Sequence, residues 1–413
     1  MIQVLRNRTY RSLFSAQVIA LVGTGLLTVA LGLLAFDLAG AAAGSVLGTA
    51  LTIKMVAYVG VAPLIGAVVD RLPKKAVLVS ADAIRLLIAA MLPFVTETWQ
   101  IYVLVFVLQS ASATFTPAFQ SLIPSVLPEP RDYTRALALS RLAYDLEALL
   151  SPLLAAVLLT VISYNNLFLG TAVGFAASAA LVVTTRLPAL SHDQPASSFW
   201  QRLSTGMRVF ARSPSLRFLM LTNIVVAAGT ALVLVNSVVY AKGVFGFDDA
   251  ALAVALGAYG VGSLVVAWNI PWVVERIGVT RTMLTGTAVV ASGLVAAIGV
   301  TIIAVDTGTG WWALLIVCLI LGAGTSLINT PSSRLLAEAS TPTNRNLVYT
   351  AQFALSHACF LITYPLAGWL GATSLPAAAE ALAGVGVLGT IAALLLHRRQ
   401  TPPADIDHLT TTT

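Results

Sequence analysis

Long apolar stretches of about 20 residues follow one another along most of the chain, and this succession constrains the fold more than any other feature. Each stretch is long enough to cross a bilayer as a helix, because a helix rises about 1.5 Å per residue and the hydrocarbon core is about 30 Å thick. Charged residues make up only 10% of the 413 residues, whereas a soluble domain carries about 25%. The sequence therefore predicts an all-α membrane protein.

The apolar stretches divide into two sets of six around a polar segment. The expected transmembrane spans are 12–38, 45–69, 76–95, 100–122, 135–160 and 165–186, followed by 216–241, 250–274, 282–304, 311–333, 346–371 and 376–397. The predicted parts are an N-terminal six-helix bundle (1–187), a cytoplasmic linker (188–214) and a C-terminal six-helix bundle with a short cytoplasmic tail (215–413). Within the linker, residues 199–212 are amphipathic and are expected to lie along the membrane surface.

Basic residues mark one set of span ends. Lys and Arg collect there, from Arg6 before the first span to Arg399 after the last, whereas Lys242 lies at the opposite ends among several acids. Because cytoplasmic loops carry an excess of Lys and Arg, both termini are expected in the cytoplasm, with the helices in the cytoplasmic (inner) membrane. This topology and anionic lipid account for the net charge of +6, so no nucleic-acid partner is expected.

A charged turn closes the second span. It occupies residues 66–75 with the sequence GAVVDRLPKK, and a weaker copy, PWVVERIGVTR, occupies residues 271–281. Glycine or proline permits close packing, the acid can hold a neighbouring helix end, and the basic residues stay with the headgroups. The repetition predicts two similar halves with turns that latch one conformation. The expected latch residues are Gly66, Asp70, Arg71, Lys74, Lys75, Asp82, Arg85, Glu275 and Arg276.

Ionisable residues inside the spans are the candidate functional groups, because a charge in hydrocarbon is costly and must be paired or face water. At 1.5 Å per residue, Asp145, His357 and Lys54 lie about 14 to 16 Å from the starts of their helices, near the bilayer midplane. Substrate sites of transporters with repeated halves lie at this depth. The expected substrate- and proton-binding residues are Asp145, Glu147, His357, Lys54, Arg141 and Tyr144.

Spacing predicts which of these charges can pair. Arg141 and Asp145 are four residues apart and share one helix face, whereas Glu147 points to a different side of the same helix. Asp82 and Arg85 are three residues apart, and they are expected to pair and to brace their helix. For the Arg141–Asp145 pair two roles stay open, holding the bundle together or acting in transport.

The pattern G-x-x-x-D-R-x-x-[RK]-[RK] between two membrane helices, carried here by residues 66–75, resembles the loop signature of the major facilitator superfamily. The resemblance implies the major facilitator fold, with twelve transmembrane helices in two six-helix bundles. It also implies a secondary active transporter that works by alternating access. No ATP-binding signature occurs, so an ion gradient is the expected energy source. A monomer without a cofactor is expected.

Three stretches are also similar to bacterial nickel-resistance permeases of the NreB type. They are WQIYVLVFVLQSASATFTP (99–117), TRALALSRLAYDLEALLSP (134–152) and LSHACFLITYPLAGWLG (355–371). This resemblance implies an antiporter that exports Ni²⁺, and also cobalt or iron, in exchange for protons, with Asp145, Glu147 and His357 as metal ligands. Two features depart from the pattern: Ser151 precedes Pro152 where the antiporter motif has glycine, and the tail lacks a histidine-rich run.

Two other functions stay open. The first is proton-coupled efflux of organic compounds such as drugs or siderophores, resembling the macrolide-efflux and enterobactin-export branches, with Lys54 available to an anionic group. The second is a receptor or scaffold that binds without transport, although the repeated turn argues against a static protein. No Ser-His-Asp arrangement, phosphate-binding loop or zinc helix motif occurs, so an enzyme is not expected.

Overall fold

The computed structural model describes residues 2–61, 72–186, 199–303, 307–340 and 345–400. Every regular element in these ranges is a helix. Within α6 the side chains of Arg141, Tyr144 and Asp145 lie outside the described part.

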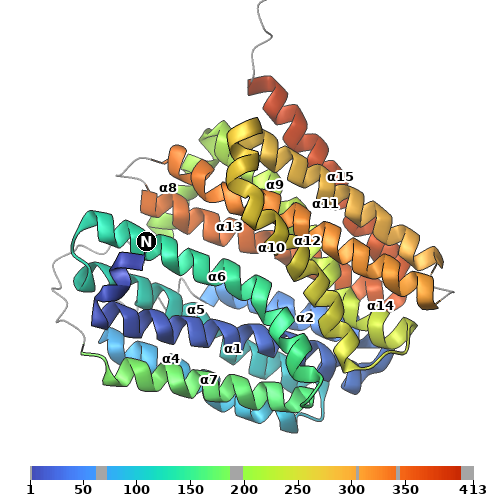
Figure 1. Cartoon of the computed structure of the whole chain (residues 1–413), viewed down its shortest axis with the longest axis horizontal. Coiled ribbons are helices and arrows are strands. Elements are labelled where there is room, and N and C mark those ends of the chain that lie inside the picture. Colours follow the sequence, from blue (N-terminus) through green and yellow to red (C-terminus); the bar gives the residue numbers. More distant parts are fainter. Residues whose placement is uncertain (1, 62–71, 187–198, 304–306, 341–344, 401–413) are drawn as a thin grey trace, which may run out of the picture.

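The N-terminal helices form one bundle, at the lower left of Figure 1. Short helical turns lie between or before them, η1 (Ile2–Arg6), η2 (Gly40–Ala42), η3 (Ala57–Val61) and η4 (Leu92–Phe94). At the end of the first helix Gly40 has a φ of 52° and donates its N–H to the carbonyl of Phe36, which closes that helix before the next begins. The helices are α1 (Arg8–Ala39), α2 (Ala43–Val56), α4 (Lys74–Met91), α5 (Thr98–Val126), α6 (Pro130–Leu159) and α7 (Tyr164–Thr184).

The C-terminal helices form a second bundle, at the upper right of Figure 1. They are α9 (Pro214–Ala231), α10 (Asp249–Ile277), α11 (Val279–Ile303), α12 (Thr307–Glu338), α13 (Arg345–Pro365), α14 (Gly371–Thr373) and α15 (Leu375–Gln400), with η5 (Leu232–Asn236), η6 (Val239–Val244) and η7 (Leu366–Leu370). The expected amphipathic segment of the linker is α8 (Phe199–Arg212), which packs against α9 and α13 and buries Phe210.

The predicted architecture is confirmed. Ten helical stretches of the described residues are long and apolar enough to cross a membrane. The first of these stretches, Arg8–Val61, contains two of the expected spans, which meet at η2, and α6 covers the expected span 135–160. The chain is therefore an all-α membrane protein with twelve transmembrane helices in two bundles of six.

Several transmembrane segments contain π-helical turns, which the sequence analysis did not predict. They are η3, η5, η6 and η7. The segment η7 follows directly after Pro365, whose ring removes one backbone N–H from the helix ladder. The turns of η3 and η7 lie where the bundles meet, because η3 contacts α13 and η7 contacts α2. Such turns are frequent at functional positions in helices.

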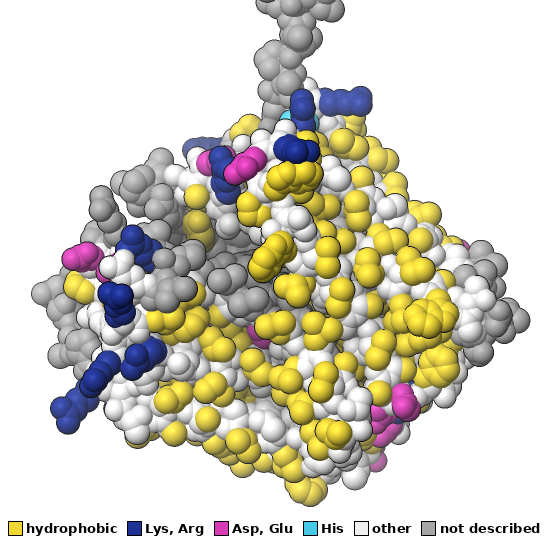
Figure 2. Space-filling view, viewed as in Figure 1, with side chains coloured by type: hydrophobic (Ala, Val, Ile, Leu, Met, Phe, Trp, Pro, Cys, Tyr) yellow, Lys and Arg dark blue, Asp and Glu magenta, His cyan; other side chains and the backbone are white. Residues whose placement is uncertain are grey.

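The two ends of the molecule differ in charge. We call the end that carries Arg8, Lys75 and Arg399 the basic end, and the end that carries Asp37 and Asp249 the acidic end. Figure 2 shows Lys and Arg side chains along the left side and at the top of the molecule, and apolar side chains over most of the rest of this face. This distribution is the one expected for a protein surrounded by lipid.

The hydrophobic core joins the bundles at the acidic end. One cluster of buried side chains runs through both bundles and includes Leu31 and Leu47 from the acidic half of the N-terminal bundle. The basic half of that bundle has a core of its own, with Leu78, Phe119 and Leu122. The halves of the protein are thus packed together at one end and have separate cores at the other.

Candidate functional site

Lys54 lies on α2 inside the membrane-spanning part, and its side chain is half-buried. Tyr58 follows four residues later in η3, so the two side chains share one side of the segment. The hydroxyl of neighbouring Thr52 donates a hydrogen bond to the carbonyl of Gly48, at 2.6 Å, so this polar group is satisfied within the helix. The amine and the phenol are therefore the polar groups that α2 presents at this depth.

Glu147 reaches the same region from α6. Its carboxylate and the Lys54 ammonium interact electrostatically. Neither side chain forms an ion pair or a hydrogen bond with the residues that the structure describes. The structure thus brings together two of the residues that the sequence predicted for the site, from two helices of one bundle.

Gly25 on α1 makes room for Glu147. A Cβ atom at Gly25 would lie 2.9 Å from Oε1 of Glu147 and 2.2 Å from Cβ of Ser151, one turn further along α6. These distances are shorter than real Cβ contacts, so only glycine permits α1 and α6 to approach this closely. The Ser151 hydroxyl is buried and has no hydrogen-bond partner in the described part of the chain.

His357 on α13 faces Tyr58 across the boundary between the bundles. The two rings are nearly parallel with centroids 5.3 Å apart, and the Phe353 ring lies 4.2 Å from the imidazole and 5.9 Å from the phenol. Nδ1 of His357 lies 2.7 Å from the carbonyl oxygen of Phe353. A carbonyl oxygen only accepts hydrogen bonds, so Nδ1 carries a proton here.

An aromatic stripe continues from this point along α13. We use this name for Phe353, His357, Phe360 and Tyr364, whose spacing of four, three and four residues places them on one helix face. Phe360 and Tyr364 stack with centroids 4.9 Å apart. The stripe runs from the half-buried site to the close contact between the bundles, because a Cβ at Gly48 of α2 would lie 2.8 Å from the Tyr364 carbonyl oxygen.

The bundles are closed against each other at the acidic side of this site. A Cβ at Gly48 would lie 2.8 Å from Cα of Gly368 in η7, and a Cβ at Gly368 would lie 2.6 Å from the carbonyl oxygen of Gly44. The indole Nε1 of Trp369 also donates to the Thr49 hydroxyl at 3.0 Å.

The predicted Asp82–Arg85 pair forms in the structure and lies inside the N-terminal bundle. The two side chains are buried and form an ion pair. Ser178 of α7 donates to Asp82 at 2.7 Å. The guanidinium lies over the rings of Phe115 and Phe175, at 4.4 and 4.7 Å from their centroids. The pair therefore ties α4 to α5 and α7, and the predicted pairing is confirmed, whereas its action as part of a conformational latch stays a prediction.

Only part of the expected latch lies within the described residues, since Gly66, Asp70 and Arg71 fall outside them. The ammonium of Lys75 donates to the carbonyls of Val183 and Thr185 at the end of α7, at 2.6 and 3.0 Å, and thus joins two helices of one bundle.

The remaining latch residues are Lys74, Glu275 and Arg276. Lys74 is buried at the start of α4. In the second copy of the turn, Arg276 lies 3.9 Å from the centroid of Trp272, and Glu275 and Arg276 are both exposed in the last turn of α10. Their action as a latch stays a prediction.

The predicted metal site is only partly visible. No group of three His, Cys, Asp or Glu side chains comes together among the described residues. Glu147 and His357 lie on different bundles, and the third expected ligand, Asp145, has its side chain outside the described part, as have Arg141 and Tyr144. The pairing of Arg141 with Asp145 and the binding of a metal therefore stay predictions.

Tyr58, Phe353 and Gly25 were not predicted from the sequence. Tyr58 could have been found, because it lies four residues after Lys54 on the same helix face. Phe353 could have been found in the same way, four residues before His357. The role of Gly25 depends on a contact with a helix more than a hundred residues away, and no local pattern indicates it.

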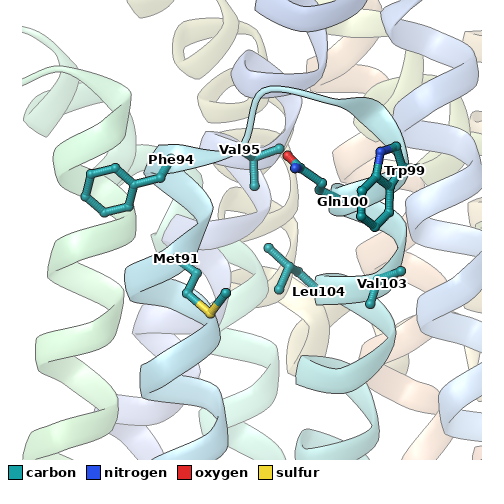
Figure 3. Close-up of a pocket in the computed structure, with 7 residues that line it drawn as sticks. All are labelled: Met91, Phe94, Val95, Trp99, Gln100, Val103 and Leu104. Atoms are coloured by element: carbon teal, nitrogen blue, oxygen red, sulfur yellow. The ribbon is translucent and has the colours of Figure 1, made fainter.

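A separate apolar pocket lies where α4 ends and α5 begins, at the acidic end (Figure 3). Phe94 is 79% exposed and Trp99 is 60% exposed, as is usual for aromatic rings at the membrane interface. Gln100 accepts hydrogen bonds from the backbone N–H groups of Thr96 and Glu97, so its amide caps the helix start. This pocket is separate from the Lys54–Glu147 site, because the two share no residue. It is lined by Met91, Phe94, Val95, Trp99, Gln100, Val103 and Leu104.

Sequence comparison assigns the family. The model of the Major Facilitator Superfamily matches residues 13–293 and 257–410. The chain therefore belongs to the Major Facilitator Superfamily, a family of membrane transporters. The general resemblance drawn from residues 66–75 is thereby confirmed.

Curated relatives are found among efflux proteins. Macrolide efflux protein A of Streptococcus pyogenes is 24% identical over 220 residues, which are 51% of this chain and 53% of that protein. Macrolide efflux protein A of Enterococcus faecalis is 26% identical over 188 residues, 42% of this chain and 58% of that protein. The chain thus spans little more than half the length of these relatives. The narrower resemblance to nickel permeases stays a prediction.

Solved structures share the fold at low identity. The nucleoside transporter NupG (D323A mutant) superposes with a TM-score of 0.72 at 15% identity, covering 94% of this chain and 99% of that one. A bacterial homologue of the iron transporter ferroportin, in its inward-facing state, superposes with a TM-score of 0.69 at 14% identity, covering 94% of this chain and 98% of that one. Cargoes as different as nucleosides and iron occur on this fold, so the fold alone does not identify the cargo.

Proposed function

We propose that this protein is a proton-coupled exporter of organic compounds that works by alternating access. The observation that carries the proposal is that two ionisable side chains inside the membrane-spanning part, Lys54 and Glu147, interact electrostatically, while Tyr58, one turn after Lys54, stacks on His357 of the aromatic stripe. Charged groups inside a membrane protein are costly, and they mark substrate or proton pathways. Aromatic rings beside them provide apolar surface for an organic molecule.

A divalent metal is the less suitable cargo for this arrangement. The Lys54 ammonium repels a metal ion that approaches Glu147, and aromatic carbon surrounds His357 on the side of Tyr58 and Phe353. The efflux relatives support organic cargo as well. We therefore place organic efflux, the alternative prediction from the sequence, ahead of nickel export.

The closure at one end supports a direction of transport. The distribution of Lys and Arg predicts that the basic end faces the cytoplasm, and the bundles are packed together at the acidic end. In this orientation the state is inward-facing, and cargo enters from the cytoplasm. Outward opening then exposes Glu147 to a more acidic periplasm, where its protonation releases the cargo, and Lys54 balances its charge in the ionised state.

Transport by purified protein in liposomes with an imposed pH gradient tests the proposal, with a macrolide and Ni²⁺ assayed in parallel. Glu147→Gln should weaken macrolide export about ten- to a hundredfold, because it removes one interaction with a charged group worth about 1.5–3 kcal/mol. The matched control is Glu338→Gln, since Glu338 is exposed and pairs only with Arg334 among the described residues.

Two outcomes would contradict the proposal. One is full macrolide export by Glu147→Gln, which would remove this carboxylate from the mechanism. The other is gradient-dependent movement of Ni²⁺ without movement of any organic compound, which would restore the metal prediction.

A further inference from the structure

A cluster of charged groups joins the two bundles at the acidic end, away from the Lys54–Glu147 site. Lys242 of η6 lies 3.6 Å from Asp37 of α1, so this ion pair crosses from the C-terminal to the N-terminal bundle. The same ammonium forms a second ion pair with Asp249 at the start of α10, within its own bundle. On the other side, the Tyr164 hydroxyl of α7 donates to Asp37 at 2.5 Å.

The surroundings show that the cluster lies at a closed contact. The Lys242 ammonium lies 5.3 Å from the centroid of Phe36, again across the bundles. Val239, one turn before Lys242, is 5% exposed, and its methyl group would lie 3.4 Å from a Cβ placed on Gly44 of α2. The Lys242 side chain itself is 16% exposed, whereas those of Asp37 and Asp249 are 43% and 33% exposed.

Asp37 and Lys242 each have a second polar partner within their own bundle. Asp37 has Tyr164 in its own bundle, and Lys242 has Asp249 in its own bundle. Of these ion pairs and hydrogen bonds, separation of the bundles at this end breaks only the Lys242–Asp37 pair. Each half then keeps a polar partner, so opening leaves no charged group without one at a surface that water enters.

We propose that Lys242, Asp37, Asp249 and Tyr164 form a divided gate, in which Asp37 holds the acidic end closed and Asp249 and Tyr164 make its opening reversible. Both acids compete for one ammonium, and they therefore act in opposite directions. Asp37 stabilises the closed state, whereas Asp249 stabilises the open state by retaining Lys242. The inference uses the alternating access of the proposed function but does not depend on the cargo.

The test measures opening without any cargo. The reporter is Val239→Cys in the full-length protein, purified and placed in lipid nanodiscs, and the rate of its reaction with a maleimide is recorded. Cys318 and Cys359 are buried, and the protein without the reporter gives their background. A shift toward the open state exposes residue 239 and raises the rate.

The two carboxylates should give opposite results. Asp37→Asn and Lys242→Gln should raise the labelling rate about two- to fivefold, the range expected for a partly exposed ion pair. Asp249→Asn should lower it by a similar factor, because Lys242 then has only Asp37 as a carboxylate partner among the described residues. Tyr164→Phe, which changes no charge, should also lower the rate.

Two controls complete the design. Asp248→Asn removes one charge next to Asp249 but keeps a side chain that can cap α10, and it should leave the rate unchanged. Raised salt should increase the rate in the parent protein but not in Lys242→Gln, because salt screens exposed ion pairs.

If Asp249→Asn raises the rate as Asp37→Asn does, the divided gate is wrong, and the acids merely stabilise the ends of their helices. Equal rates in all variants would overturn it too. Because the assay contains no macrolide, metal or pH gradient, a failure of the proposed cargo would leave these results unaffected.

Discussion

Two pairs of opposite charges lie within the N-terminal bundle, and they differ in burial and in direct contact. Asp82 and Arg85 are buried and form an ion pair, and a serine hydroxyl and two aromatic rings contact them. Lys54 and Glu147 are only half-buried, and they interact through space without an ion pair or a hydrogen bond to the described residues.

The contrast separates a structural role from a functional one. A buried charge pair in direct contact has little surface to offer to cargo, and its loss damages the fold. Half-buried charges that form no ion pair with the described residues cost stability, so their presence in a membrane helix is best explained by function. The comparison predicts that mutations of the two pairs will affect different measurements.

The largest effect on stability is expected from Arg85→Ala. It leaves Asp82 buried without its cation and should lower the free energy of unfolding by about 3–5 kcal/mol, as for other broken buried pairs. Thermal unfolding in detergent, followed by the loss of monodisperse protein, measures the change. Arg135→Ala is the control, because the Arg135–Asp132 pair is partly exposed and should contribute less than about 1 kcal/mol. Equal melting temperatures of both variants would show that the buried Asp82–Arg85 pair stabilises the fold no more than a partly exposed pair does.

An intermediate effect is expected from Gly25→Ala, which acts on the second pair through packing. The added methyl group collides with Cβ of Ser151, and the overpacking should cost about 1–3 kcal/mol. It should also displace Glu147 and reduce transport. Gly170→Ala is the matched control, since nothing lies within 4 Å of a Cβ there. Unchanged transport by Gly25→Ala would show that Glu147 does not need its position against α1.

The smallest effect on stability is expected from Lys54→Met. Methionine keeps the length of the side chain and removes a charge that forms no ion pair with the described residues, so the free energy of unfolding should change by less than about 1 kcal/mol. Transport should nevertheless fall, because Glu147 loses the group that balances its charge. Thermal unfolding and macrolide export, measured in parallel, test both expectations. A large loss of stability with normal export would show that Lys54 and Glu147 have a structural role rather than a functional one.

Much of the fold follows from local patterns in the sequence. The apolar spans fix the number and order of the helices, and the ends of α7, α10 and α15 lie within a few residues of the expected positions. The i, i+3 spacing of Asp82 and Arg85 predicted their pairing, because this relation depends only on helix geometry. Such features require no knowledge of how distant helices pack.

The site was predictable only in part. Lys54, Glu147 and His357 were predicted as site residues because an ionisable group inside a membrane span is costly to bury. Their surroundings, however, depend on contacts between distant segments. Tyr58 stacks on a ring almost 300 positions later, and Gly25 makes room for a carboxylate on another helix. The π-helical turns were not predicted either, because hydrophobic periodicity does not indicate them. Of these turns, η7 directly follows Pro365, which lacks a backbone N–H.

The contact between Gly48 and Gly368 has a consequence for leakage. Backbone meets backbone there, so no side chain can change rotamer and open a gap. A continuous file of water through this point would let protons run down their gradient past the ionisable groups at the centre of the protein. We therefore expect Gly48 and Gly368 to block this path in the closed state, and a larger residue at either position to let water and protons pass through the membrane.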